Sequence, residues 1–102
     1  MSVEKKTLAK NGVCKVTFNL PSSIAETART AHVVGDFNDW DPTRHPMKKT
    51  KNGKFSLSLE LPGNSEYEFR YLVDGTNWET DWEADSLNPA PWGDEYNSVV
   101  KL

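Results

Sequence analysis

Two tryptophans stand in loops among residues that favour turns, and their chemistry is the most distinctive feature of the sequence. Trp40 lies in GDFNDWDP, residues 35–42, and Trp78 follows DGTN, residues 74–77. A flat indole matches the apolar C–H face of a sugar ring, and nearby Asn, Arg and Asp side chains can hydrogen-bond its hydroxyls. We therefore interpret Trp40 and Trp78 as a binding platform, with Phe37 pinning the first loop to the core.

The other two of the four tryptophans, Trp82 and Trp92, lie in the irregular segment ETDWEADSLNPAPWGDEYN, residues 79–97. The alternating strands already supply a small core with aromatic side chains. We expect Trp82 and Trp92 to cover the open end of the fold.

Candidate catalytic and metal-binding residues are few. His32, in an apolar strand, and His45, in a polar loop, have no second His or Cys at the spacing of metal ligands. Cys14 is the single cysteine, so an internal disulfide and a zinc site built from cysteines are excluded, and we expect it to face the core. We predict no enzyme, no cofactor and no metal site.

The acidic residues gather in loops rich in Asn, Gly and Pro, where carboxylates accept backbone hydrogen bonds as Asx turns. These residues are Asp36, Asp39, Asp41, Asp74, Asp81, Asp85 and Asp94. The glycine and glutamate of a calcium loop are absent from their pattern. A glycosidase-type pair of carboxylates stays open, because the spacing of two groups in space cannot be read from the chain.

The elements that must position these residues are strands. Alternating or short apolar runs predict strands over residues 13–20, 30–35, 55–61, 66–73 and 97–102, with 30–35 as a candidate central strand. Arg70 falls on the outward face of its strand. Residues 23–29 read as a loop, and Asn52-Gly53 as the turn of a hairpin tip within residues 48–54. We predict a single all-β domain over residues 1–102, an antiparallel β-sandwich.

The composition argues against two classes of binding partner, nucleic acids and membranes. The formal charge of −3 and the pI near 5.3 argue against nucleic-acid binding, which requires clustered Lys and Arg. The sequence has neither the apolar run of a signal peptide nor a segment of membrane-spanning length, so we expect a cytoplasmic protein without membrane contact.

Five segments in order carry a resemblance to a known family. VVGDFNDWDP, GKFSLSLELP, YEFRYLVDG, NWETD and NSVVKL resemble the glycogen-binding, isoamylase N-terminal type of carbohydrate-binding module. This early-set, immunoglobulin-like β-sandwich is found in starch branching and debranching enzymes and in the β subunit of AMP-activated protein kinase. The likeness extends from about Thr30 to the C-terminus.

The resemblance implies four site residues. In the kinase-type module an α-glucan chain lies between two tryptophans, which correspond to Trp40 and Trp78, while a basic residue and an asparagine bond to its hydroxyls. These correspond to Arg70, four residues before the aspartate of Val-Asp-Gly, and to Asn97, which opens the last strand. Small relatives usually carry Asp-Pro after the second tryptophan. Here Trp82 follows Asp81, which makes Trp82 an additional candidate for stacking.

The leading hypothesis is therefore a non-catalytic α-glucan-binding module. The alternative is a protein-interaction domain that docks a carbohydrate-active enzyme or another partner. A third interpretation is the N-terminal domain of a glycoside hydrolase without its catalytic barrel. Exposed tryptophans that share one face would favour sugar binding, whereas buried ones or ones at opposite ends would favour a protein partner.

Overall fold

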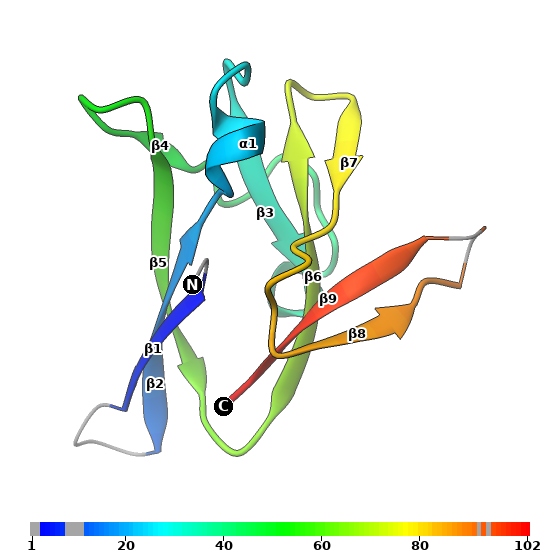
Figure 1. Cartoon of the computed structure of the whole chain (residues 1–102). Coiled ribbons are helices and arrows are strands. Elements are labelled where there is room, and N and C mark those ends of the chain that lie inside the picture. Colours follow the sequence, from blue (N-terminus) through cyan, green and yellow to red (C-terminus); the bar gives the residue numbers. More distant parts are fainter. Residues whose placement is uncertain (1–2, 8–11, 92, 94) are drawn as a thin grey trace.

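Two antiparallel sheets pack face to face in the computed structural model, which describes residues 3–7, 12–91, 93 and 95–102 (Figure 1). The first sheet has the order β1 (Val3–Thr7), β2 (Val13–Asn19), β5 (Phe55–Pro62) and β4 (Lys48–Lys49). The second has the order β3 (Ala31–Gly35), β6 (Glu66–Val73), β9 (Tyr96–Lys101) and β8 (Ser86–Pro89), and β7 (Asn77–Glu79) pairs with β6. The predicted all-β, immunoglobulin-like sandwich is confirmed.

The core fills the space between the sheets, because the strands alternate as the sequence predicts. Val16 and Phe18 of β2 are fully buried, as are Phe69 and Tyr71 of β6. The rings of Phe18 and Phe69 meet edge to face with their centroids 5.0 Å apart, which joins the two sheets at their centre. Cys14 is also buried, as predicted.

Two sequence predictions about the elements are wrong. Residues 23–29 were expected to form a loop, but Ser22–Ala25 form a single helical turn, α1, which begins directly after Pro21 and buries Ala25. Pro21 can open this turn because its carbonyl accepts hydrogen bonds from the amides of Ile24 and Ala25. No helix among the described residues has the length and apolar content needed to cross a membrane.

The second error concerns β3, which was predicted to be central and lies instead at an edge of its sheet. Its outer edge is covered by the following loop, since Val33 donates its amide hydrogen to the carbonyl of His45 and Met47 donates to that of Ala31. An edge strand protected in this way can be as apolar as a central one. Hydrophobic composition alone therefore could not distinguish the two positions.

The loop that follows β7 is anchored by a fully buried aspartate. The carboxylate of Asp81 accepts a hydrogen bond from Tyr71 Oη (2.9 Å) and one from the backbone amide of Glu83 (3.0 Å), the second being the predicted Asx turn. The amide of Asp81 donates to Ser98 Oγ at 2.7 Å. Burial, with the negative charge of Asp81 beside it, raises the pKa of Tyr71 well above its usual value, so the phenol stays protonated and donates.

Replacing Tyr71 with phenylalanine tests this anchor. The change removes a donor from a buried carboxylate, and we expect a loss of about 1–3 kcal/mol of unfolding free energy in urea denaturation. Tyr67→Phe is the matched control, because Tyr67 Oη donates to the exposed carbonyl of Pro62 (2.9 Å), and we expect a loss of no more than about 1 kcal/mol. Equal losses for the two variants would contradict the anchoring role of Asp81.

Candidate functional site

The outer face of the second sheet carries three of the four predicted site residues. Arg70 points outward because its neighbours Phe69 and Tyr71 belong to the core. Trp78 pairs with Leu72, which lies two residues beyond Arg70 on β6, so Trp78 and Arg70 share this face. Leu72 and Arg70 are both buried.

Asn97 joins the same face through β9. It lies two residues before Val99, which pairs with Glu68 of β6. Its Nδ2 donates to Glu68 Oε1 at 3.0 Å. Asn97 is 3% exposed, and its Oδ1 has no hydrogen-bond partner among the described residues.

Trp40, the fourth residue, is fixed to this sheet by one carboxylate. Asp36 Oδ1 accepts a hydrogen bond from the indole Nε1 of Trp40 (2.9 Å), while Oδ2 accepts one from the backbone amide of Glu68 (2.8 Å). Asp36 therefore links the indole directly to β6, just where β3 ends. Asp39 and Trp40 both adopt left-handed backbone conformations, with φ of 57° and 56°. Two such residues in succession are costly unless the surrounding contacts fix the loop.

The short helix η1 (Asp36–Asn38) supplies those contacts. Asn38 is buried, accepts a hydrogen bond from the amide of Gly35 (3.0 Å) and donates one to the carbonyl of Val33 (2.9 Å). Phe37 packs against the core ring of Phe18 with the centroids 5.5 Å apart. The prediction that Phe37 pins this loop to the core is confirmed.

A groove of about 390 Å³ opens beside Trp40. It is lined by Asp36, Trp40, Glu68, Pro89, Pro91 and Asn97. Its walls thus combine one indole and two proline rings with two carboxylates and a buried amide. This mixture suits a ligand that has both apolar faces and hydroxyl groups.

Arg70 and Trp78 form the adjoining part of the site. The guanidinium carbon of Arg70 lies 5.9 Å from the centroid of the Trp78 ring, and Arg70 Nη2 donates to Glu95 Oε1 at 2.6 Å. Arg70 is 2% exposed, and neither Nε nor Nη1 has a hydrogen-bond partner within the described part of the chain. Trp78 is 40% exposed. Because Glu68 and Arg70 are two residues apart on one strand, the groove and this pair are about 7 Å apart along β6.

The prediction that Trp82 covers the open end of the fold is wrong. Trp82 was expected to cover the end of the sandwich, but it is 67% exposed and contacts the ring of Tyr96 at a centroid distance of 6.1 Å. Trp92, and also Asp94, lie outside the residues that the structure describes. Sequence reasoning did not find the supporting roles of Asp36, Glu68 and Glu95, for which the sequence offers no signal beyond their charge.

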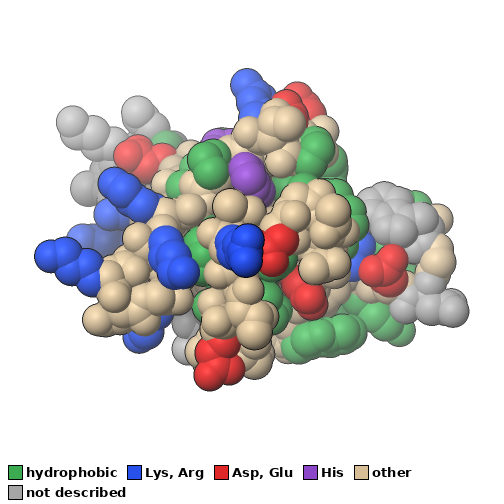
Figure 2. All heavy atoms as spheres, turned by 90° about the horizontal axis from the view of Figure 1, so that it is seen from above, with side chains coloured by type: hydrophobic (Ala, Val, Ile, Leu, Met, Phe, Trp, Pro, Cys, Tyr) green, Lys and Arg blue, Asp and Glu red, His purple; other side chains and the backbone are tan. Residues whose placement is uncertain are grey.

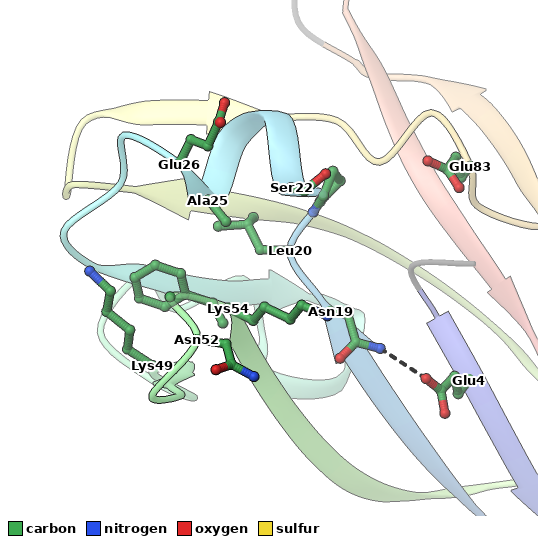
Figure 3. A pocket seen from close by; sticks show the side chains of 13 residues that line it. Glu4, Asn19, Leu20, Ser22, Ala25, Glu26, Lys49, Asn52, Lys54 and Glu83 are labelled. Carbon is green, nitrogen blue, oxygen red and sulfur yellow. Dashed lines mark hydrogen bonds between the residues drawn. The ribbon is translucent and has the colours of Figure 1, made fainter.

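A larger hollow of about 680 Å³ lies elsewhere, between α1, the hairpin of β4 and β5, and the end of β2 (Figure 3). Lys49 and Lys54 stand on one side of it, with Glu26, which follows α1, on another. Phe55, an aromatic residue of its lining, is only 3% exposed. Figure 2 shows Lys and Arg side chains gathered on the left of the molecule, the side of the first sheet. The hollow contains none of the predicted site residues and offers a mixed ionic surface rather than an aromatic one.

Comparison with known proteins gives matches over most of the chain. The model of a family described as carbohydrate-binding module 48 (isoamylase N-terminal domain) matches residues 10–90. The chain is 43% identical over 70 residues to protein PTST homolog 2, chloroplastic, of Arabidopsis thaliana, a match that covers 68% of this chain and 11% of that protein.

Branching enzymes give similar matches. The chain is 34% identical over 82 residues to the 1,4-alpha-glucan branching enzyme GlgB of Photobacterium profundum, covering 76% of this chain and 11% of the enzyme. It is 33% identical over 61 residues to the chloroplastic/amyloplastic 1,4-alpha-glucan-branching enzyme of Oryza sativa subsp. japonica, covering 53% and 7%. The chain therefore spans about a tenth of the length of the curated relatives it matches.

The anchoring of Trp40 by Asp36 can be tested by one change of charge. Asp36→Asn replaces one acceptor oxygen with an NH2 group that cannot accept a hydrogen bond, and we expect a loss of about 1–2 kcal/mol of stability and a shift of the Trp40 indole N–H resonance. Asp39→Asn is the matched control, since Asn tolerates the left-handed conformation and we expect a change below about 0.5 kcal/mol. An unmoved indole resonance in Asp36→Asn would show that the carboxylate does not hold the ring.

Proposed function

Since the chain belongs to the carbohydrate-binding module 48 family, we propose that it binds an α-glucan chain on the outer face of its second sheet. Trp40 and Trp78 stack on the glucose rings, while Arg70 and Asn97 hydrogen-bond to the hydroxyls. The chain acts as a binding module and carries out no catalysis. The names of its relatives support an α-glucan as the ligand, because the enzymes among them are 1,4-alpha-glucan branching enzymes.

The observation that carries this proposal is the set of unused polar atoms beside the two indoles. Arg70 Nε and Nη1 and Asn97 Oδ1 are buried and without hydrogen-bond partners among the described residues. An unsatisfied buried polar group costs roughly 1–3 kcal/mol. Because these three atoms have almost no exposed surface, a ligand hydroxyl reaches them by displacing the side chains that cover them, and the hydrogen bond then removes this cost. A hydroxyl can both donate to Asn97 Oδ1 and accept from Arg70, whereas an apolar ligand could do neither.

The support beneath the indoles also favours a stacking role. Arg70 lies on one side of the Trp78 ring and is itself held by Glu95, while Trp40 is held through its indole nitrogen by Asp36. Both rings are therefore fixed before a ligand arrives, which lowers the entropy lost on binding. Each ring keeps exposed surface for a sugar, since Trp78 is 40% exposed and Trp40 is partly buried.

A protein partner is the second candidate. The matched segment is about a tenth of each branching enzyme, so in those proteins it belongs to a much longer chain. A domain of this kind could dock a carbohydrate-active enzyme through a surface other than the groove. The exposed ring of Trp82, 67% accessible, is the observation that favours this candidate.

The affinity of a single site should be low. Covering about 50 Å² of apolar area on each indole contributes roughly 1 kcal/mol, and each exposed hydrogen bond adds about 0.5–1.5 kcal/mol. Association costs offset several kcal/mol of this gain. We expect a dissociation constant of about 10 μM to 1 mM, strengthened on a polymer by binding at several sites.

Titration with maltoheptaose, followed by the indole resonances, tests the proposal. We expect Trp40→Ala and Trp78→Ala each to weaken binding about fivefold to tenfold, since each removes one stacking face worth roughly 1–1.4 kcal/mol. Trp78→Phe retains a ring and should lose less. Thermal unfolding of each variant verifies that the fold is kept, and no spectral change at millimolar maltoheptaose would contradict sugar binding.

A further inference from the structure

Trp82 and Tyr96 form a second exposed aromatic pair. Their rings meet at 62° with the centroids 6.1 Å apart, and they are 67% and 42% exposed. Together with Trp78 they are the large hydrophobic residues with the greatest exposure among those described. Neither ring contributes to the groove beside Trp40.

The pair lies on the other side of β9 from that groove. Tyr96 and Asn97 are consecutive residues of β9, so their side chains point to opposite faces. Asn97 lines the groove. Ser98, on the same face as Tyr96, binds the backbone of Asp81, whose carboxylate contacts the core residue Tyr71.

The backbone beneath the pair is held by several hydrogen bonds. Asp81, directly before Trp82, is fully buried and bonds to Tyr71, Ser98 and the amide of Glu83. Thr80 Oγ1 donates to the carbonyl of Tyr96 at 2.8 Å, which ties the two segments to each other. Solvent-exposed rings on a rigid backbone are pre-organised for a ligand, because little conformational freedom remains to be lost.

We propose that Trp82 and Tyr96 form a second α-glucan-binding site, separate from the groove and on the opposite side of β9. The proposal rests on the proposed function for the choice of ligand. Two rings in an angled arrangement can cradle the curved apolar face of a short α-linked segment. The carboxylate of Glu83, next to Trp82 in the chain, is exposed and can accept hydrogen bonds from hydroxyls. This carboxylate also disfavours an anionic ligand.

Two sites on opposite faces of one strand make the domain bivalent. One glucan chain bound in the groove leaves the Trp82–Tyr96 pair free for a neighbouring chain of the same particle. The second contact is then effectively intramolecular, so weak sites combine into stronger retention on a branched polymer than on a short oligosaccharide.

The test uses maltotriose and the Trp82 indole N–H resonance of the intact chain. It compares wild type with the double variant Trp40→Ala/Trp78→Ala, in which the groove is disabled. We expect the Trp82 resonance to follow a saturable isotherm in both proteins, with dissociation constants that agree within twofold. Tyr96→Ala should weaken that isotherm at least fivefold, whereas Tyr96→Phe, which keeps the ring, should stay within twofold of wild type.

The outcomes separate this proposal from the proposed function. A Trp82 resonance that stays fixed while that of Trp78 saturates overturns the second site and leaves the groove intact. If neither resonance responds, both proposals fail. A Trp82 resonance that shifts with protein concentration instead of sugar would assign the pair to self-association and overturn the proposal.

Retention on immobilised glycogen tests the bivalence. Trp82→Ala, a change at a mostly exposed side chain, should preserve folding and reduce retention at least tenfold, while leaving the maltotriose isotherm of Trp78 unchanged. Retention equal to that of wild type would contradict a second contact with the polymer.

Discussion

The pairing of β6 with three other strands is the constraint on which the rest of the molecule depends. Its inward residues Phe69 and Tyr71 fill the core, and its outward residue Arg70 lies against one side of the Trp78 ring. Because side chains alternate strictly along a strand, packing the core also fixes where the outward residues lie. The energy of hydrophobic burial on one face therefore positions polar groups on the other.

Carboxylates connect the loops to this framework. Asp36 accepts hydrogen bonds from the indole of Trp40 and from the backbone of β6. Asp81 accepts one from Tyr71 through its carboxylate, and its backbone amide donates to the side chain of Ser98. In each case the carboxylate of a residue in a turn accepts hydrogen bonds from donors that are not paired within the strand ladders. The aromatic residues beside these aspartates can therefore remain near solvent and still keep a defined position.

Much of the fold could be predicted from the sequence because strong alternation marks β2, β5 and β6. The short strands β7 and β8 were missed, since three or four residues carry too little pattern. Strand β1 was also missed, because Val3 is its one apolar residue. The edge position of β3 depends on a loop contact that leaves no periodic trace. The four candidate site residues were assigned through motif order. Trp82 was wrongly expected to cover the end of the sandwich, because the exposure of a loop residue depends on packing with residues far away in the sequence. The sequence also does not reveal that Asp81, and not Trp82, is the buried residue of this loop.

The adjacency of Tyr96 and Asn97 has a consequence for how this domain can change. A single-residue insertion or deletion within the first part of β9 would turn both side chains over, sending the amide inward and the phenol into the groove. Substitutions can tune either face separately, but changes of length cannot. Variation in loop length should therefore accumulate before β9, between β8 and Tyr96, and stop abruptly where the strand begins.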